Sequence, residues 1–316
     1  MYKMNFTLTL IFFFLAITTA AYAATWYVDD DAPNDPGPNN PQISDPSENG
    51  YPDHPFDMIQ EGIDIASNGD IILVLSGTYV ESVDFINKDI ALRSDTDGDP
   101  ATIDPDPHNT VIDGDQKPRA VWIQNGQGQD TILEGFTVTN GDGGIICINS
   151  SPTIKNNLIT FNNLTYSDYG AGIFCYNSNS DIISNTITKN NSLHNGGGIY
   201  CELSNPTISK NIIAFNTSGN AGGIDCNYSS SPLINNNIIF GNSAASGNTG
   251  GIKCNNFSSP QIISNIIAGN FGGSGGGGIT CFESSATLIW GVTFSLRRSR
   301  RPFQFSVVRP ERIPPI

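Results

Sequence analysis

Gly197-Gly198-Ile199-Tyr200-Cys201 is one copy of the short motif that decides how this chain folds. The motif, Gly-Gly-Ile-x-Cys with Ala in place of the first Gly once, recurs at intervals of 25 to 28 residues. The copies end at Cys147, Cys175, Cys201, Cys226, Cys254 and Cys281. Ile and Cys stand two residues apart, so in a strand they share one face while x lies on the other. Stacked copies bury a continuous core that a single copy cannot make.

Each unit continues with two further short apolar runs that end in asparagines. Residues 208–216 show the pattern Ile-x-x-Asn-x-Ile-x-x-Asn. Stacking places like residues in ladders about 4.8 Å apart, with isoleucines inside. We expect the asparagines to take left-handed corner conformations and to hydrogen-bond along their ladders. Two such ladders are expected, Asn157, Asn185, Asn211, Asn237 and Asn265, and Asn162, Asn190, Asn216, Asn242 and Asn270.

These runs are too short for helices and are broken by Gly, Pro and Asn, so the sequence predicts an all-β solenoid, a parallel β-helix. Leucine-rich repeats are the competing solenoid, but their leucine pattern is missing. The repeat resembles that of right-handed parallel β-helix proteins of the pectin-lyase-like fold, which include carbohydrate-binding proteins and sugar hydrolases. The resemblance covers about residues 56 to 289, and the right-handedness is implied by it alone.

The start of the chain has the features of a secretory signal peptide, residues 1–23. Lys3 supplies the positive charge, residues 8–17 are nearly all apolar, and Ala21-Tyr22-Ala23 is a cleavage site. The apolar run is shorter than the roughly 20 residues that span a bilayer. The sequence therefore predicts a mature chain without membrane insertion that is secreted, periplasmic or on the cell surface.

Three segments follow before the end of the chain. Residues 24–55 are a leader rich in Asp, Pro and Asn, expected to be mostly loop-like. Residues 56–140 are expected to form an N-terminal cap and irregular first coils, because residues 56–66 have helical spacing and a helix would cover the open end of the solenoid. Residues 141–289 hold the regular repeats.

Residues 290–316 form an aberrant tail. After Leu288 the repeat predicts Asn, Ile and Asn, where the chain has Gly291, Thr293 and Leu296. Six of the eight arginines lie in this tail. Two interpretations remain, a truncated or frame-shifted end and a basic segment that binds polyanions. We expect disorder from about Trp290 onward.

The composition limits the partners. The formal net charge is −15, which disfavours nucleic acid and anionic membranes. All six cysteines hold the same inward position, so we predict buried free thiols, not disulfides. Nothing in the repeat predicts self-association, and the chain is expected to be a monomer.

Function in such a solenoid is expected on the outward positions of its strands. Two outward rows follow from the motif, the x row and, one residue after Cys, the y row. The rows offer rings that can stack on sugars and polar groups that can bind hydroxyls. The candidate substrate-binding residues are Phe174, Tyr176, Tyr200, Asn227, Lys253 and Asn255.

Two carboxylates on this face could act together. Glu202 and Asp225 lie on adjacent rungs and different rows, so we expect about 6–9 Å between them, a spacing that suits an inverting glycosidase. The resemblance also implies lyases that use a calcium-binding acidic cluster and an arginine base. No such cluster lines the repeats, and Arg93 and Arg119 lie outside them, which disfavours a lyase.

One further acidic segment could bind a metal. Asp95, Asp97 and Asp99 alternate as in part of a calcium loop, although the later ligands of an EF-hand are missing. Calcium is the one cofactor that the sequence suggests.

The sequence thus predicts a secreted or surface β-helix protein with a polysaccharide-binding or adhesive face. Two alternatives remain, a polysaccharide-degrading enzyme (a pectate-lyase-like lyase or an inverting glycoside hydrolase) and a structural surface-display protein. The expected partner is a polysaccharide or cell-surface glycan.

Overall fold

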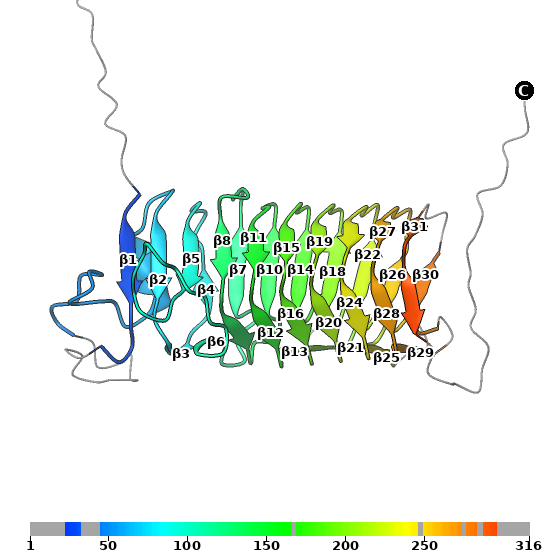
Figure 1. Cartoon of the computed structure of the whole chain (residues 1–316), viewed down its shortest axis with the longest axis horizontal. Helices are drawn as coiled ribbons and strands as arrows, with labels where there is room; N and C mark the ends of the chain where they lie inside the picture. The colour runs from blue at the N-terminus through cyan, green and yellow to red at the C-terminus, as the bar shows by residue number, and fades with distance from the viewer. Residues whose placement is uncertain are drawn as a thin grey trace, which may run out of the picture.

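The computed structural model describes residues 23–32, 45–165, 169–245, 249–273, 276–282 and 287–295. The predicted signal peptide, apart from Ala23, and residues 296–316 of the tail lie outside these ranges. Within them the chain is an all-β parallel solenoid, as predicted, and Figure 1 shows its strands stacked along the long axis from β1 at one end to β31 at the other. Every strand pair between rungs is parallel.

Four sheets run along the solenoid, and each complete coil contributes one strand to each of the first three. Sheet I contains β1 (Thr25–Val28), β2 (Ile71–Val74), β5 (Ala91–Ser94), β8 (Ile132–Glu134), β11 (Thr153–Lys155), β15 (Asp181–Ile183), β19 (Thr207–Ser209), β23 (Leu233–Asn235), β27 (Gln261–Ile263) and β31 (Leu288–Trp290).

Sheet II carries the Gly-Gly-Ile-x-Cys strands. It contains β4 (Val83–Asp84), β7 (Val121–Gln124), β10 (Ile145–Ile148), β14 (Ile173–Tyr176), β18 (Ile199–Glu202), β22 (Ile224–Asn227), β26 (Ile252–Cys254) and β30 (Ile279–Cys281).

Sheet III follows the first asparagine ladder. It contains β3 (Gly77–Val80), β6 (Thr110–Asp113), β9 (Thr137–Thr139), β12 (Leu158–Thr160), β16 (Thr186–Thr188), β20 (Ile212–Ala214), β24 (Ile238–Phe240), β28 (Ile266–Ala268) and β32 (Thr293–Ser295). The short sheet IV contains β13 (Asn163–Leu164), β17 (Asn191–Ser192), β21 (Thr217–Ser218), β25 (Ser243–Ala244) and β29 (Phe271–Gly272).

The core is one continuous apolar cluster inside the coils. Its isoleucines and cysteines are fully buried in the regular repeats, because the inward positions of all rungs stack on one another. Ile199, for example, pairs in register with Ile173 on one side and Ile224 on the other. Each repeat of about 27 residues therefore forms one coil, and its inward side chains form one layer of the core.

Both asparagine ladders form as predicted. The amide Nδ2 of Asn211 donates to Oδ1 of Asn237 on the next rung at 3.1 Å and to the carbonyl oxygen of Ile182 on the previous rung at 2.8 Å. Its own Oδ1 accepts from the backbone N–H of Asn185 at 2.8 Å. These side chains thus satisfy backbone groups that the turn would otherwise leave unpaired.

The left-handed corner lies one residue earlier than we predicted. Lys210, immediately before Asn211, has a φ of 58°, and Phe215, before Asn216, has a φ of 56°. The ladder asparagines themselves are not among the described residues with positive φ. The asparagine is needed for its amide, which hydrogen-bonds to the rungs on both sides. The residue before it adopts the left-handed conformation of the corner.

The N-terminal end is covered by a strand and a short helix. Helix α1 (Ile59–Ile65) packs against β1, β2 and β4, in agreement with the predicted capping helix. The leader is not all loop, however, because β1 extends sheet I by pairing with β2. Trp26 also anchors the leader through a 3.1 Å hydrogen bond to Asp70.

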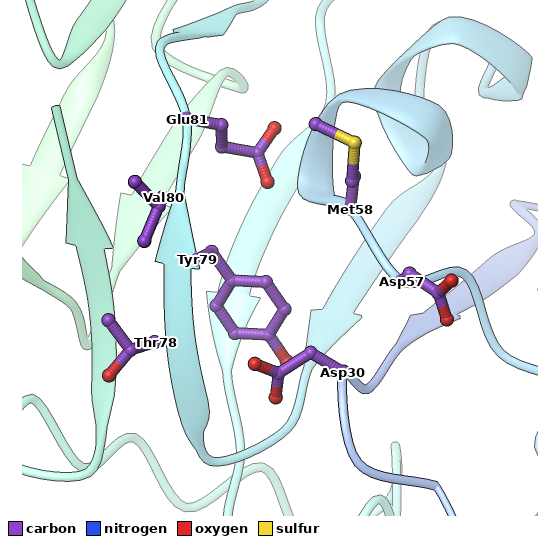
Figure 2. Close-up of a pocket in the computed structure, with 7 residues that line it drawn as sticks. All are labelled: Asp30, Asp57, Met58, Thr78, Tyr79, Val80 and Glu81. Carbon is purple, nitrogen blue, oxygen red and sulfur yellow. The ribbon is translucent and has the colours of Figure 1, made fainter. Parts of the chain in front are cut away.

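Glu81 fixes the start of the capping helix. Its carboxylate accepts the backbone N–H groups of Ile59 at 2.8 Å and Gln60 at 3.0 Å. Figure 2 shows this carboxylate directed toward the first turn, close to Met58, with the Tyr79 ring between Glu81 and Asp30. Burial raises the pKa of Glu81 to about 7, against the effect of the two N–H donors.

At the other end, residues 290–295 continue the solenoid, whereas disorder was expected from Trp290 onward; the rest of the tail lies outside the described residues. Ile289 pairs with Ile262 and Phe294 with Ile267, so β31 and β32 continue sheets I and III. The true register is one residue later than the sequence suggested, and Gly291 (φ 63°) occupies the left-handed position of Ser264. A one-residue shift exchanges inward and outward side chains, and it places Phe294 at an isoleucine position.

Candidate functional site

In the regular repeats, sheet II stacks so closely that the residue before each strand is glycine. A Cβ on Gly198 would lie 2.6 Å from the carbonyl oxygen of Gly223 on the next rung. The glycines thus permit the Ile and Cys that follow to enter the core and turn the x and y rows outward. Phe174, Tyr200, Asp225 and Lys253 occupy four consecutive positions of the x row, between Ile146 and Thr280.

The x row is outward but buried, which corrects the expectation of a solvent face. Tyr200 and Asp225 are completely buried, and Phe174 and Lys253 are 7% and 8% exposed. The chain before two of these strands folds back over the x residue, since a Cβ on Gly170 would lie 2.9 Å from Cβ of Phe174 and one on Gly196 would lie 2.6 Å from Cβ of Tyr200.

An aromatic cluster outside the core fills this space at the second and third regular rungs. Tyr169 stacks on Tyr200 with 4.8 Å between ring centroids, and Phe174 lies 5.5 Å from Tyr200. Ile146 belongs to the same cluster. The rings predicted to stack on a ligand therefore mainly pack on one another.

Arg119 holds the covering segment in place. Its guanidinium is fully buried and donates to the carbonyl oxygens of Gly170 at 2.8 Å and Tyr169 at 2.9 Å. It also lies 5.8 Å from the centroid of the Phe174 ring. Sequence reasoning missed Arg119 and Tyr169 as parts of the site. The available signal was that Arg119 is one of two arginines before the tail.

The y row remains accessible. Tyr176, Glu202 and Asn255 are half-buried, whereas Asn227 between the last two is 6% exposed. With Gln124 and Ile148 on earlier rungs, these residues form a line along the solenoid that we call the outer strip. Beside it runs the corner row, Asn125, Asn149, Asn177, Leu203, Tyr228 and Asn256.

Buried hydrogen bonds tie the outer strip to the x row. The Tyr200 hydroxyl donates to Oε2 of Glu202 at 3.0 Å and accepts from Nδ2 of Asn227 at 3.2 Å. Oδ1 of Asn227 accepts from Nδ2 of Asn256 at 2.7 Å. Burial, and then the charges of Glu202 and Asp225, raise the pKa of Tyr200. Tyr200 is therefore a neutral phenol that orients the strip, and Asn227 is already fully engaged.

Asp225 is the exceptional group of this face. Both its carboxylate oxygens are buried without a hydrogen-bond partner. Burial raises the pKa of Asp225 to about 6, while the nearby charge of Lys253 lowers it. Of the predicted catalytic pair, only Glu202 reaches solvent, so the structure disfavours a reaction on a polymer between Glu202 and Asp225. The pair stays a prediction.

The predicted calcium ligands do not converge. Asp95 accepts the backbone N–H groups of Gly98 and Asp104, and Asp97 and Asp99 each accept an N–H two residues ahead. Calcium at these three residues stays a prediction without geometric support. Among the described residues, one group of three carboxylates is close enough to share a cation. Asp29, Asp30 and Asp31 have carboxylate oxygens within 4.8 Å of one another.

Two small hollows lie near the N-terminal cap, away from the outer strip. One, of about 120 Å³, is lined by Tyr27, Asp29, Pro52, Pro55, Leu75, Asp97 and Gly98. The other lies under α1 and is lined by the residues drawn in Figure 2. Burial first, and then the carboxyl group of Asp31, raise the pKa of Asp29 to about 6.

The cysteines form a ladder of free thiols, as predicted. Five are fully buried, and Cys281 on the last rung is partly exposed. The adjacent thiol of Cys175 and burial raise the pKa of Cys147 and Cys201 well above the ordinary thiol range. Five of the six thiols have no contact with solvent, so this ladder is part of the core and not of a reactive site.

The fold and the repeat define a parallel β-helix. Residues 108–246 match the family model of the right handed beta helix region. Two crystal structures of the pectin methylesterase from Aspergillus niger, in deglycosylated and penultimately deglycosylated forms, are similar with 12% identity, a TM-score of 0.39, and 88% of this chain and 87% of that one covered. That likeness carries no argument about activity. No curated protein matches the sequence.

Within the part of the chain that the structure describes, no helix is long and apolar enough to cross a membrane.

Proposed function

We propose that this chain is a secreted or surface β-helix protein that binds a polysaccharide along the outer strip. The observation that carries the proposal is the half-buried line of Tyr176, Glu202 and Asn255 along the solenoid axis, with Tyr176 and Glu202 on adjacent rungs and Asn255 two rungs further. Successive rungs are about 4.8 Å apart, so the line can contact an extended polymer at several points.

The chemistry of the line suits sugar hydroxyls. Tyr176 offers part of a ring, held against Phe174 at 6.4 Å between centroids. The amide of Asn255, which makes no side-chain hydrogen bond to another described residue, can both donate and accept. The Tyr200 hydroxyl fixes the Glu202 carboxylate in advance, which reduces the entropy lost on binding.

A glycan array with the purified mature chain tests the proposal. Tyr176→Ala and Asn255→Ala should each weaken binding to a bound glycan by about fivefold or more, in the range of single contacts at an interface. Thr217→Ala, at an exposed position of sheet IV, is the matched control and should bind as wild type. A protein that binds no glycan on the array would favour the structural surface-display alternative.

The hydrolase and lyase alternatives have a separate test. A reducing-sugar and unsaturated-product assay, with and without calcium, detects either activity. Product that disappears in Glu202→Gln would restore the catalytic interpretation of the strip.

A further inference from the structure

The charge on the outer strip determines which kind of polymer it can accept. Among the residues of the outer strip and the corner row, Glu202 is the one with a charged side chain. Lys253, which the sequence placed among the ligands, lies under this surface with 8% of its area exposed, and its charge acts on the buried Asp225. The accessible strip therefore carries negative charge and presents no cation.

The other described basic side chains lie outside the outer strip and the corner row, although Lys117, Lys189 and Lys210 are exposed. Arg93 and Lys155 pair with Glu134 on sheet I, at 3.5 Å and 3.1 Å. Arg119 is buried, and Lys189 lies over Phe161 at 4.8 Å from its ring centroid. Recognition of carboxylate, sulfate or phosphate polymers uses arginine or lysine donors, and the strip offers none.

Neutral polar groups dominate what remains. The corner row contributes exposed amides, and Nδ2 of Asn177 donates to Oδ1 of Asn149 at 2.7 Å, so the amides point along the solenoid. Tyr228 is 50% exposed beside Asn227. Amides and partly exposed rings match hydroxyl groups and apolar sugar faces. The net charge of −15 adds repulsion toward any polyanion.

We propose that the outer strip accepts an uncharged, hydroxyl-rich polysaccharide and rejects polyuronates and sulfated polymers, without need of calcium. This inference rests on the proposed function and specifies its substrate class. It separates this chain from β-helix proteins that would hold acidic polymers through bound calcium or arginine.

Matched polymers that differ only in charge test the inference. Polygalacturonate and its fully methyl-esterified form are one pair, and carboxymethyl cellulose and hydroxyethyl cellulose are another. In affinity electrophoresis with a chelator present, the wild-type chain should bind the neutral member of each pair with an affinity at least about fivefold higher than the anionic member. The difference should shrink between about 0.01 M and about 1 M salt, as the screening length falls from about 30 Å to about 3 Å.

Charge-reversal variants give the sharper result. Glu202→Lys and, independently, Asn255→Lys should raise the affinity for the anionic member relative to that for the neutral member by about fivefold or more. Asn255→Lys does not disturb the Tyr200 hydrogen bond, so it remains informative if Glu202→Lys is unstable. Thr217→Lys makes the same addition of charge on sheet IV and should change neither affinity.

The outcomes separate the two proposals. Wild-type binding that is equal or tighter for the anionic polymer overturns the neutral-substrate inference and leaves the glycan-binding proposal intact. Absence of binding to both members of every pair, together with an empty glycan array, overturns both. Loss of neutral binding in Tyr176→Ala with retention in Thr217→Lys places the polymer on the strip.

Discussion

The buried guanidinium of Arg119 donates a hydrogen bond of 2.9 Å to the carbonyl oxygen of Tyr169, 50 residues later in the chain. This contact joins an early irregular coil to the segment that covers the aromatic cluster. Because Tyr169 stacks on Tyr200, and Tyr200 orients Glu202, the position of the outer strip depends on a residue outside the regular repeats.

Arg119→Met should therefore destabilise the protein. The carbonyls of Tyr169 and Gly170 lose a buried donor, and we expect a loss of about 2–4 kcal/mol in the free energy of unfolding. Arg119→Lys keeps the charge but not the two-pronged geometry and should lie in between. Urea denaturation measures both. A methionine variant as stable as wild type would show that the covering segment does not depend on this contact.

Asn211→Ala should also be strongly destabilising. The substitution removes the buried hydrogen bonds that the Asn211 side chain makes to the backbone N–H of Asn185 and to the carbonyl oxygen of Ile182, and about 2–4 kcal/mol is expected. Asn163→Ala, which removes a comparable but exposed amide contact to Asn191, is the control and should cost less than about 0.5 kcal/mol. Equal effects of the two substitutions would contradict the importance of burial for the ladder.

Lys210→Asn should stabilise the protein. Lys210 has a φ of 58°, where Asn is better tolerated, and Asn156 and Asn236 already occupy the equivalent position in other coils. A gain of about 0.5–1 kcal/mol is expected from the melting temperature and unfolding enthalpy. Thr217→Asn, at an exposed position outside the left-handed region, should give no gain.

Asp225→Asn should change how stability depends on pH. Burial raises the folded-state pKa of Asp225 to about 6, above its ordinary value of 3.8. The stability associated with the protonated carboxyl is fully present below pH 3.8 and is lost as pH rises through about 6. The difference in unfolding free energy, Asn variant minus wild type, should therefore grow by about 3 kcal/mol between pH 4 and pH 7. A difference that stays constant over this interval would show that Asp225 has an ordinary pKa in the folded state.

The thiols should be free and mostly unreactive. The denatured, unreduced chain should show all six cysteines by thiol titration, and the native chain should show at most the partly exposed Cys281. Cys281→Ser should abolish the native reaction and leave five thiols on denaturation. Fewer than six in the wild type would indicate disulfides between rungs.

The regular coils could be predicted from the sequence because each repeated residue has one physical reason to recur. Inward isoleucines fill the core, inward cysteines fit beside them, and the amide of Asn211 reaches two rungs. The last coil was harder, since Val292 and Phe294 replace Asn and Ile. Backbone pairing tolerates these changes, so β32 forms although the motif is missing.

The candidate site could be predicted only in part. The alternation of the Gly-Gly-Ile-x-Cys strand shows which side chains point outward, and Tyr176 and Glu202 do reach the surface. It does not show that the chain before β14 and β18 folds over the x row. The position of this covering segment depends on contacts such as the hydrogen bond from Arg119 to Tyr169. Such a contact occurs once and not in every repeat, so the repeat pattern of the sequence does not indicate it.

The unbroken amide ladder from Asn157 to Asn265 has an evolutionary consequence. Each coil contacts only its two neighbours, so duplication or loss of one whole unit preserves register, core and corner geometry together. Each such event would lengthen or shorten the polymer-facing line by one rung. The avidity of this surface for a long polymer could thus change in evolution with the number of repeat units, without a change to any contact within a unit.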